Sequence, residues 1–86
     1  MIKPLRMERL AYKTIGDEAI ILDTKIGREV HQLNEVATVV WNLCNGTHDI
    51  QSMVEKVCTE FEVEPAVAER DIKALLAEFN SKSLLR

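Results

Sequence analysis

Two cysteines and two histidines are the side chains of this 86-residue chain best suited to act as nucleophile, base or metal ligand. Cys44 and Cys58 lie fourteen residues apart, without a Cys-x-x-Cys pair and without a histidine at ligand spacing, which argues against a zinc site. Both fall on apolar faces of predicted helices, which predicts buried free thiols rather than a disulfide. His31 is expected in a strand and His48 in a turn. A Cys-His catalytic pair is therefore the least favoured reading, and we expect no metal and no cofactor.

The remaining polar groups do not converge on a site for catalysis or for phosphate binding. The three glycines are isolated, so no phosphate-binding loop is predicted. The formal net charge of −3 and the isoelectric point near 5.3 argue against a protein that wraps nucleic acid. Carboxylates also outnumber basic groups on the third predicted helix, which opposes phosphate binding. These residues are Glu64, Glu69, Asp71 and Glu78 against Arg70 and Lys73.

Length and hydropathy indicate one small domain away from membranes. No apolar run approaches the roughly 20 residues of a membrane-spanning helix, and the first residues lack a signal-peptide core. We therefore expect a cytoplasmic protein with no membrane partner and no nucleic-acid partner. Residues 1–7 are expected to form a flexible basic segment ahead of a single domain over residues 8–86. The basic segment is either a solvated tail or a contact for an acidic partner.

The first part of the chain has the pattern of antiparallel strands. Apolar residues alternate or cluster in short runs that turn-forming residues separate. Ile20 and Leu22 should share one face of the second strand. The third strand is polar, with Glu29, His31 and Gln32 among its residues, which suits an exposed sheet edge. The predicted strands are residues 9–13, 19–22 and 28–33.

The apolar period changes from two to about 3.6 after the third strand, which indicates helices. Capping residues mark the helix starts, and Gly46, a residue suited to a left-handed backbone conformation, marks the end of the first helix. The expected helices run from Asn34 to Gly46, from Asp49 to Phe61 and from Pro65 to about Asn80. An aliphatic core should be pinned by Trp41, Phe61 and Phe79. The order predicts an α+β fold: a small winged-helix-like domain with a three-stranded antiparallel sheet followed by three helices.

The junction of the third strand and the first helix resembles the signature of a known family. The runs Leu33-Asn34-Glu35-x-Ala37 and Val40-Trp41-x-Leu43-Cys44-Asn45-Gly46 are similar to the PqqD family, named for its role in pyrroloquinoline quinone (PQQ) biosynthesis. The resemblance extends over about residues 8–86. It also includes Ile21-Leu22-Asp23, Asp71-Ile72 and Leu84-Leu85.

The resemblance implies a RiPP recognition element, a domain that serves the biosynthesis of ribosomally made, modified peptides. Such a domain is a peptide chaperone without catalysis of its own. It captures the leader segment of a precursor peptide by β-augmentation and presents it to a modifying enzyme, often a radical S-adenosylmethionine (radical SAM) protein, as in PQQ or other RiPP biosynthesis.

The chain also departs from the family pattern. Many relatives carry Gly-Arg-aromatic-aromatic-x-Leu-Asn, whereas here Gly27 and Arg28 precede a longer segment without an aromatic residue. The peptide specificity should therefore differ. Val36 and Val39 are apolar where polar residues are common. They form either a second contact surface or a widened core stripe.

The resemblance places the peptide as a strand added to the third strand, in the groove beside the third helix. An edge strand also offers unpaired backbone groups for such pairing. In this hypothesis Ile72 and Leu76 line the floor of the pocket, while Glu69 and Lys73 form a charged rim that sets the register. The alternatives are that Ile72 and Leu76 are ordinary core residues, and that Glu69 and Lys73 lie on a solvent-exposed face. The edge itself is formed by Glu29, Val30, His31, Gln32 and Leu33.

Two other function classes remain as alternatives. The topology is close to that of a winged-helix DNA-binding module, although the acidic third helix disfavours it. A structural role through self-association by Val36 and Val39 is the other. The exposed edge is compatible with either a monomer or a weak homodimer.

Overall fold

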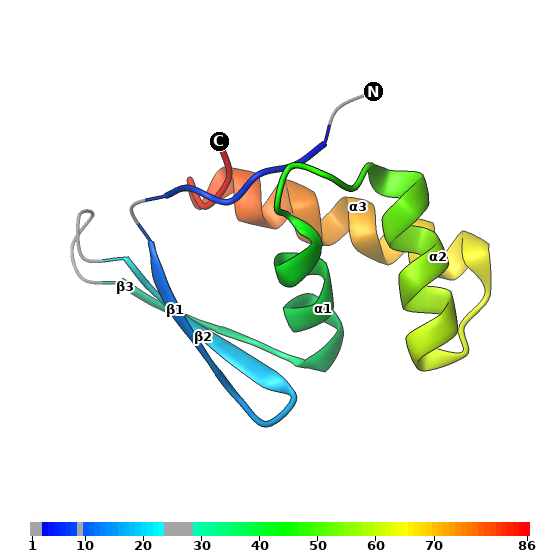
Figure 1. Ribbon diagram of the computed structural model, residues 1–86, viewed down its shortest axis with the longest axis horizontal. Coiled ribbons are helices and arrows are strands. Elements are labelled where there is room, and N and C mark those ends of the chain that lie inside the picture. The colour runs from blue at the N-terminus through cyan, green and yellow to red at the C-terminus, as the bar shows by residue number, and fades with distance from the viewer. Residues whose placement is uncertain (1–2, 9, 24–28) are drawn as a thin grey trace.

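Three antiparallel strands precede three helices along the chain, and the sheet lies beside the helical part (Figure 1). The computed structural model describes residues 3–8, 10–23 and 29–86. This order confirms the predicted α+β class and its winged-helix-like arrangement. The elements are β1 (Ala11–Ile15), β2 (Glu18–Asp23), β3 (Glu29–Leu33), α1 (Glu35–Leu43), α2 (Ile50–Phe61) and α3 (Pro65–Ser81).

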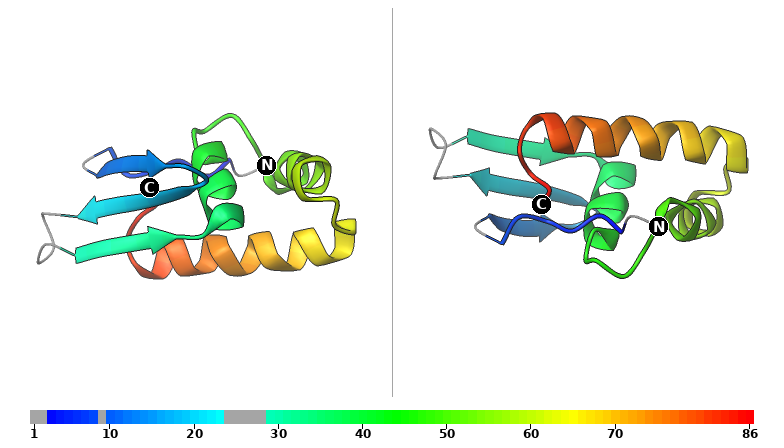
Figure 2. Two further views of the ribbon diagram at one scale, coloured as in Figure 1. Left: turned by 90° about the horizontal axis from the view of Figure 1, so that it is seen from below. Right: turned by 90° about the horizontal axis from the view of Figure 1, so that it is seen from above.

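The sheet has the order β1-β2-β3, so β1 and β3 are its edges, and β3 lies on the side of α3 (Figure 2). β1 begins and ends later than the predicted 9–13, because its pairing with β2 continues to the tight turn. Gly16 has a φ of 63° there, a left-handed conformation typical of two-residue hairpins. Arg9 and the predicted hairpin loop, with Arg28, lie outside the described residues.

The two faces of β2 differ in burial. Ala19 and Ile21 are completely buried on the inner face, against which α1 packs. Ile20 and Leu22 share a face, as predicted, but it is the outer one, and Leu22 is 39% exposed. An uninterrupted apolar run does not indicate which alternate pair points inward. The packing of α1 on the sheet decides that Ala19 and Ile21, rather than Ile20 and Leu22, point inward.

The helix starts follow the predicted capping residues. The Asn34 side chain accepts a hydrogen bond from the Ala37 N–H at 2.9 Å, and Asp49 caps α2 in the same way. Pro65 occupies the first turn of α3. α1 ends at its C-cap, Cys44, and Gly46 follows with the expected positive φ of 82°. The Gly46 N–H donates to the Pro4 carbonyl, so the exit from α1 also contacts the N-terminal segment.

Trp41 occupies the centre of the core. It is fully buried, and its ring centroid lies 5.5 Å from that of Phe79 and 5.7 Å from that of Tyr12, both in edge-to-face geometry. Such pairs add to the stabilisation from apolar burial. The prediction of Trp41 and Phe79 as core anchors is confirmed.

Two residues of α2 are less buried than predicted. Met53 and Val57 form the buried stripe of this helix. Cys58 is one position away from that stripe, and Phe61 lies in the last turn, so both are only partly buried. Cys44 is fully buried, as expected, and both thiols are free.

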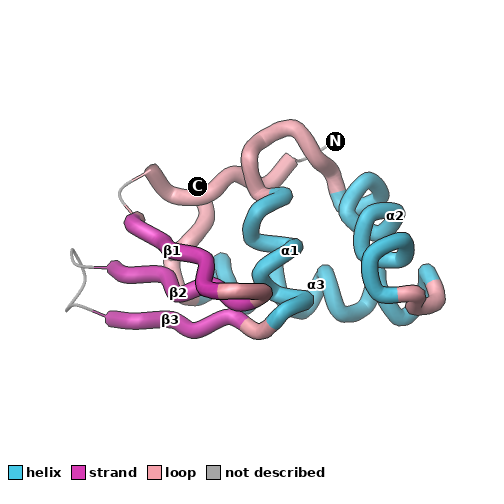
Figure 3. The backbone as a smooth tube through the Cα atoms, turned by 60° about the horizontal axis from the view of Figure 1, so that its bottom comes forward, coloured by secondary structure: helices cyan, strands magenta, loops and turns pink. Residues whose placement is uncertain are grey.

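The described part of the N-terminal segment is hydrogen-bonded to the rest of the domain, and the flexibility expected of residues 1–7 stays a prediction. Arg6 N donates to the Cys44 carbonyl and Met7 N to the Leu84 carbonyl, each at 2.9 Å. Leu5 forms a bridge with Asn45, and Arg6 with Leu85. Figure 3 shows these terminal loop segments running next to each other. Arg6 thus contacts the last residues of the chain and the end of α1.

Candidate functional site

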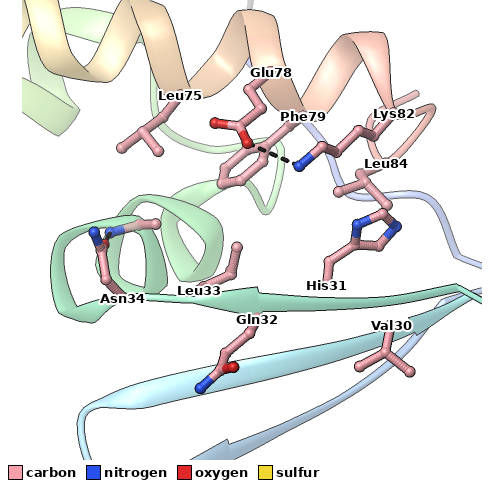
Figure 4. A pocket seen from close by; sticks show the side chains of 11 residues that line it. Val30, His31, Gln32, Leu33, Asn34, Leu75, Glu78, Phe79, Lys82 and Leu84 are labelled. Atoms are coloured by element: carbon pink, nitrogen blue, oxygen red, sulfur yellow. Dashed lines mark hydrogen bonds and ion pairs between the residues drawn. The ribbon is translucent and has the colours of Figure 1, made fainter.

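A cleft of about 300 Å³ separates β3 from the C-terminal half of α3 (Figure 4). β3 forms one wall and α3 the other, and the chain end contributes at one side. The strand contribution is residues 30–34. Helical and terminal residues that line the cleft are Ala37, Leu75, Glu78, Phe79, Lys82 and Leu84.

Of the predicted edge residues, Val30, His31, Gln32 and Leu33 line the cleft, whereas the exposed Glu29 does not. Peptide binding by any of them stays a prediction. Within the described residues β3 pairs with β2 alone, from Asp23↔Glu29 to Ala19↔Leu33. In an antiparallel edge strand, alternate residues direct their N–H and C=O groups away from the sheet. The His31 and Leu33 side chains point towards α3, whereas Val30 and Gln32 point to the other side (Figure 4). The cleft therefore combines a row of backbone hydrogen-bonding groups with two inward side chains.

The α3 wall differs from the prediction. Ile72 is completely buried in the core, Leu76 is partly buried, and neither lines the cleft. Glu69 lines a separate groove between α2 and α3, and its carboxylate pairs with Lys73 at 3.3 Å on the exposed surface. The structure thus brings the four predicted α3 residues to other places than the cleft. A peptide contact by any of them stays a prediction.

The residues that do line the cleft from α3 occupy one helical face. Leu75, Glu78, Phe79 and Lys82 recur at spacings of three, one and three, which is the spacing of one face. This pattern is visible in the sequence. The sequence does not indicate how far along β3 the helix lies. In the structure, only the C-terminal half of α3 lies beside the strand.

The floor of the cleft is apolar. Leu33 is 7% exposed, Ala37 3% and Phe79 1%, and Leu75 adds a partly buried side chain. An apolar side chain entering this space would lose most of its contact with water, which favours binding by roughly 25 cal/mol per Å². The floor is therefore suited to hold an apolar anchor.

A charged pair, Glu78 and Lys82, also lines the cleft. Lys82 Nζ donates to Glu78 Oε1 at 2.8 Å, and both side chains are about half exposed, so this pair contributes little to stability. The His31 side chain is 11% exposed. Its buried Nε2 atom has no hydrogen-bond partner among the described residues, since Glu29 Oε2, at 3.5 Å, lies beyond good hydrogen-bonding distance.

The chemistry of the thiols does not favour nucleophilic catalysis. Burial raises the pKa of Cys44 to about 12, and the nearby Arg6 lowers it only in part. The thiol therefore stays protonated at neutral pH, and its Sγ donates to the Val40 carbonyl at 3.2 Å. Within the described residues, no group of three or more potential metal-ligating side chains is found. No described helix has the length and apolar character required to span a membrane.

The carboxylates of α3 lie on its exposed surface, as predicted. Glu69, Asp71 and Glu78 are all exposed, as are the two basic residues Arg70 and Lys73. The helix that would enter a DNA groove in a winged-helix module thus presents an acidic excess. This charge opposes binding to phosphates.

A protein-family model matches most of the sequence of this chain. A model described as "Coenzyme PQQ synthesis protein D (PqqD)" matches residues 18–85. A "PqqA binding protein" of Xanthomonas oryzae pv. oryzae (strain PXO99A) is 31% identical over 78 residues, which cover 91% of this chain and 82% of that protein.

Solved structures with the same fold include two described with leader peptides. The structure "TbiB1 in Complex with the TbiA(beta) Leader Peptide" has a TM-score of 0.85 at 24% identity and covers 95% of this chain and 94% of its own. The PqqD truncation of Methylobacterium extorquens PqqCD, described as a stand-alone RiPP recognition element, has a TM-score of 0.77 at 20% identity, with coverages of 96% and 87%. A lasso peptide synthetase B1 complexed with the leader peptide is similar at a TM-score of 0.85 and 24% identity, with 98% of each chain covered.

Proposed function

Because the chain belongs to the PqqD family, we propose that it is a peptide-binding adaptor that captures the leader segment of a ribosomally made precursor peptide. The peptide adds to β3 as a fourth strand and is presented to a modifying enzyme, in PQQ or related RiPP biosynthesis. We propose a radical SAM enzyme as that partner and the cytoplasm as the place of action. The adaptor itself performs no catalysis, in keeping with the protonated state of Cys44.

One observation carries this proposal: a sheet edge lies directly beside an open cleft with an apolar floor. β-Augmentation needs both features, because the backbone supplies hydrogen bonds that are independent of sequence and the pocket supplies selectivity. The names of the relatives agree with it, since one is a PqqA-binding protein and two structures are described with leader peptides.

Magnitudes explain why an edge alone is insufficient. Four backbone hydrogen bonds at about 1 kcal/mol net each fall short of the roughly 8 kcal/mol of a micromolar complex. Association also costs at least about 4 kcal/mol in lost freedom of motion. An apolar side chain of the peptide in the space around Leu33, Leu75 and Phe79 supplies part of the difference.

Proline substitution in β3 tests the proposal, with Val30→Pro and His31→Pro compared as a pair. One of the two adjacent N–H groups faces β2 and the other faces the cleft. Proline at the cleft-facing position should leave the fold intact and weaken peptide binding about fivefold or more, since one hydrogen bond of about 1 kcal/mol is lost. Proline at the other position should lower the free energy of unfolding.

The measurement is fluorescence anisotropy with synthetic peptides from short reading frames next to the gene of this chain. Circular dichroism identifies which proline variant is folded. Undiminished peptide binding by that folded variant would contradict strand addition at β3.

A further inference from the structure

The Val30 side chain lies on the outer face of the sheet, which is turned away from α3 and from the cleft (Figure 4). Val30 is directly opposite Leu22 on β2, and Leu22 is directly opposite Ala11 on β1. Directly opposed residues have their side chains on the same face of a sheet. These three residues therefore form one apolar row across the outer face, and the row ends at β3.

Val30 is less covered than its neighbour in this row. Its side chain is 61% exposed, whereas Leu22 is 39% exposed. Leu22 lies on the central strand and has a neighbouring strand on each side, but among the described residues Val30 has one on a single side. One flank of the Val30 side chain is therefore open to water. A strand that pairs with β3 would cover this flank.

The proposed peptide strand would place a side chain there. Side chains alternate between the two faces along a strand, so the peptide residue directly opposite Val30 points to the outer face, whereas its two neighbours point to the cleft side. This holds for either direction of the peptide, because paired strands share one pleat. The Cβ atoms of directly opposed residues lie about 4.5 to 5.5 Å apart, which allows contact.

The next outward position of the peptide has different surroundings. It lies opposite Gln32, in a row that continues with Ile20 on β2 and Lys13 on β1. Gln32 is exposed, and its amide group is hydrated there. An apolar peptide side chain beside this amide would hinder its hydration, which is unfavourable. Of these two outward positions, the one opposite Val30 is therefore suited to an apolar residue.

We infer that Val30 is a specificity-determining residue, which selects an aliphatic side chain at the outward peptide position directly opposite it. The inference rests on the proposed function and adds a second apolar contact, on the face of the sheet that lies away from the cleft. An aliphatic side chain at this position covers the open flank of Val30, so both side chains lose contact with water. A polar peptide residue would leave this stabilisation unrealised.

A double-mutant cycle tests the inference. Peptides enriched on the full chain from a random phage library serve as probes, and fluorescence anisotropy measures their affinity. Each aliphatic peptide residue is replaced in turn by Thr, and each peptide is measured against the wild type and Val30→Thr. Threonine retains a high preference for strands. At one peptide position, the change to Thr should weaken binding to the wild type about threefold more than binding to Val30→Thr.

Two further variants assign the effect to the contact itself. Ile15→Thr is the matched control, because Ile15 is 58% exposed on the same face but lies on β1, with β2 between it and β3. No peptide position should be coupled to Ile15. Val30→Ile retains an aliphatic side chain and should keep the wild-type preference, which guards against a loss of folding in the threonine variant.

The outcomes separate the inference from the proposed function. Peptides that require the β3 edge but have no position coupled to Val30, or that are coupled equally to Ile15, would overturn the inference alone. So would a Val30→Thr variant that changes the sedimenting mass of the peptide-free chain and leaves peptide binding unaltered, since Val30 would then serve self-association. Failure to enrich any peptide, or enriched peptides that bind the folded β3 proline variant equally well, would overturn both.

Discussion

At the scale of single residues, burial determines which side chains are chemically available. His31 and Cys44 are both largely removed from water, yet their situations differ. The Cys44 thiol donates to a backbone carbonyl within its own helix. His31 Nε2 has no such partner within the described part of the chain, and the His31 residue lines the cleft. The thiol is therefore part of the core, and the imidazole belongs to the site.

Cys44 should make the stability of the fold depend on alkaline pH. Its pKa is raised from 9.0 to about 12 in the folded protein, because burial disfavours the thiolate. The folded state therefore retains this proton when the unfolded state loses it. The stabilisation is fully present below pH 9 and is lost as pH rises towards 12.

Urea denaturation between pH 9 and pH 10.5 measures this effect. The free energy of unfolding should fall with a contribution from Cys44 of at most about 1.4 kcal/mol per pH unit. Cys44→Ala should show a shallower slope, in addition to a loss of stability from the smaller side chain. Identical slopes for the wild type and the Cys44 variant would exclude this assignment.

At the scale of elements, the junction between β3 and α1 connects the fold to the site. Leu33 ends the strand and lines the cleft, and Asn34 caps the helix that follows. The Thr38 hydroxyl also donates to the Leu33 carbonyl at 3.5 Å, a long contact that spans the same junction. The direction in which β3 ends is therefore coupled to the start of α1.

Asn34→Ala should destabilise the domain by about 1 kcal/mol, because the Ala37 N–H loses its side-chain acceptor. Chemical denaturation should show a lower midpoint with an unchanged m-value. Asn42→Ala, at an exposed position within α1, should be neutral or slightly stabilising, since alanine has the higher helix propensity. Equal stability of the Asn34 variant and the wild type would show that this cap contributes nothing.

At the scale of the whole molecule, Arg6 of the N-terminal segment contacts the end of α1 and the aromatic ring of Tyr12 in β1. Arg6 Nη1 donates to the carbonyl oxygens of Trp41 and Asn42 at 2.9 and 3.0 Å. Its guanidinium carbon lies 5.3 Å from the centroid of the Tyr12 ring. A cation at a helix C-terminus is favourable, because the last carbonyl groups carry partial negative charge. One side chain thus connects the N-terminal segment, α1 and β1.

Arg6→Ala should lower the free energy of unfolding by about 1 to 2 kcal/mol, through loss of the charged hydrogen bonds and the ring contact. Thermal unfolding by circular dichroism measures the change. Lys3→Ala, which removes a positive charge from the same segment at an exposed position, should leave the melting temperature unchanged. A similar loss in both variants would indicate that net charge, rather than the Arg6 contacts, is responsible.

The surface outside the cleft bears on the alternative of self-association. Val39 is partly buried and packs against the core, as the widened core stripe predicts, and it lines a shallow groove with Leu43. The outer face of the sheet carries exposed large apolar side chains, among them Ile15, Leu22 and Val30. Leu22 and Val30 are directly paired on adjacent strands, so this face offers an apolar surface. The expectation of a monomer or a weak homodimer stays a prediction.

Local patterns in the sequence determined the elements. Period-two and period-3.6 patterns located strands and helices, and Asn34, Asp49 and Pro65 marked helix starts to within a residue. The polar composition of β3 indicated an edge strand, and the structure places it there. These features depend on neighbouring residues along the chain, so they can be predicted without the tertiary structure.

Only the tertiary structure decided which faces meet. Packing of α1 chose Ala19 and Ile21 over Ile20 and Leu22 for the core. The position of α3 along β3 put Leu75, Phe79 and Lys82 at the cleft and left Ile72 in the core. These choices depend on how elements distant in sequence lie against one another. No local period encodes that arrangement, which is why the strand wall of the cleft could be predicted from the sequence and its helix wall could not.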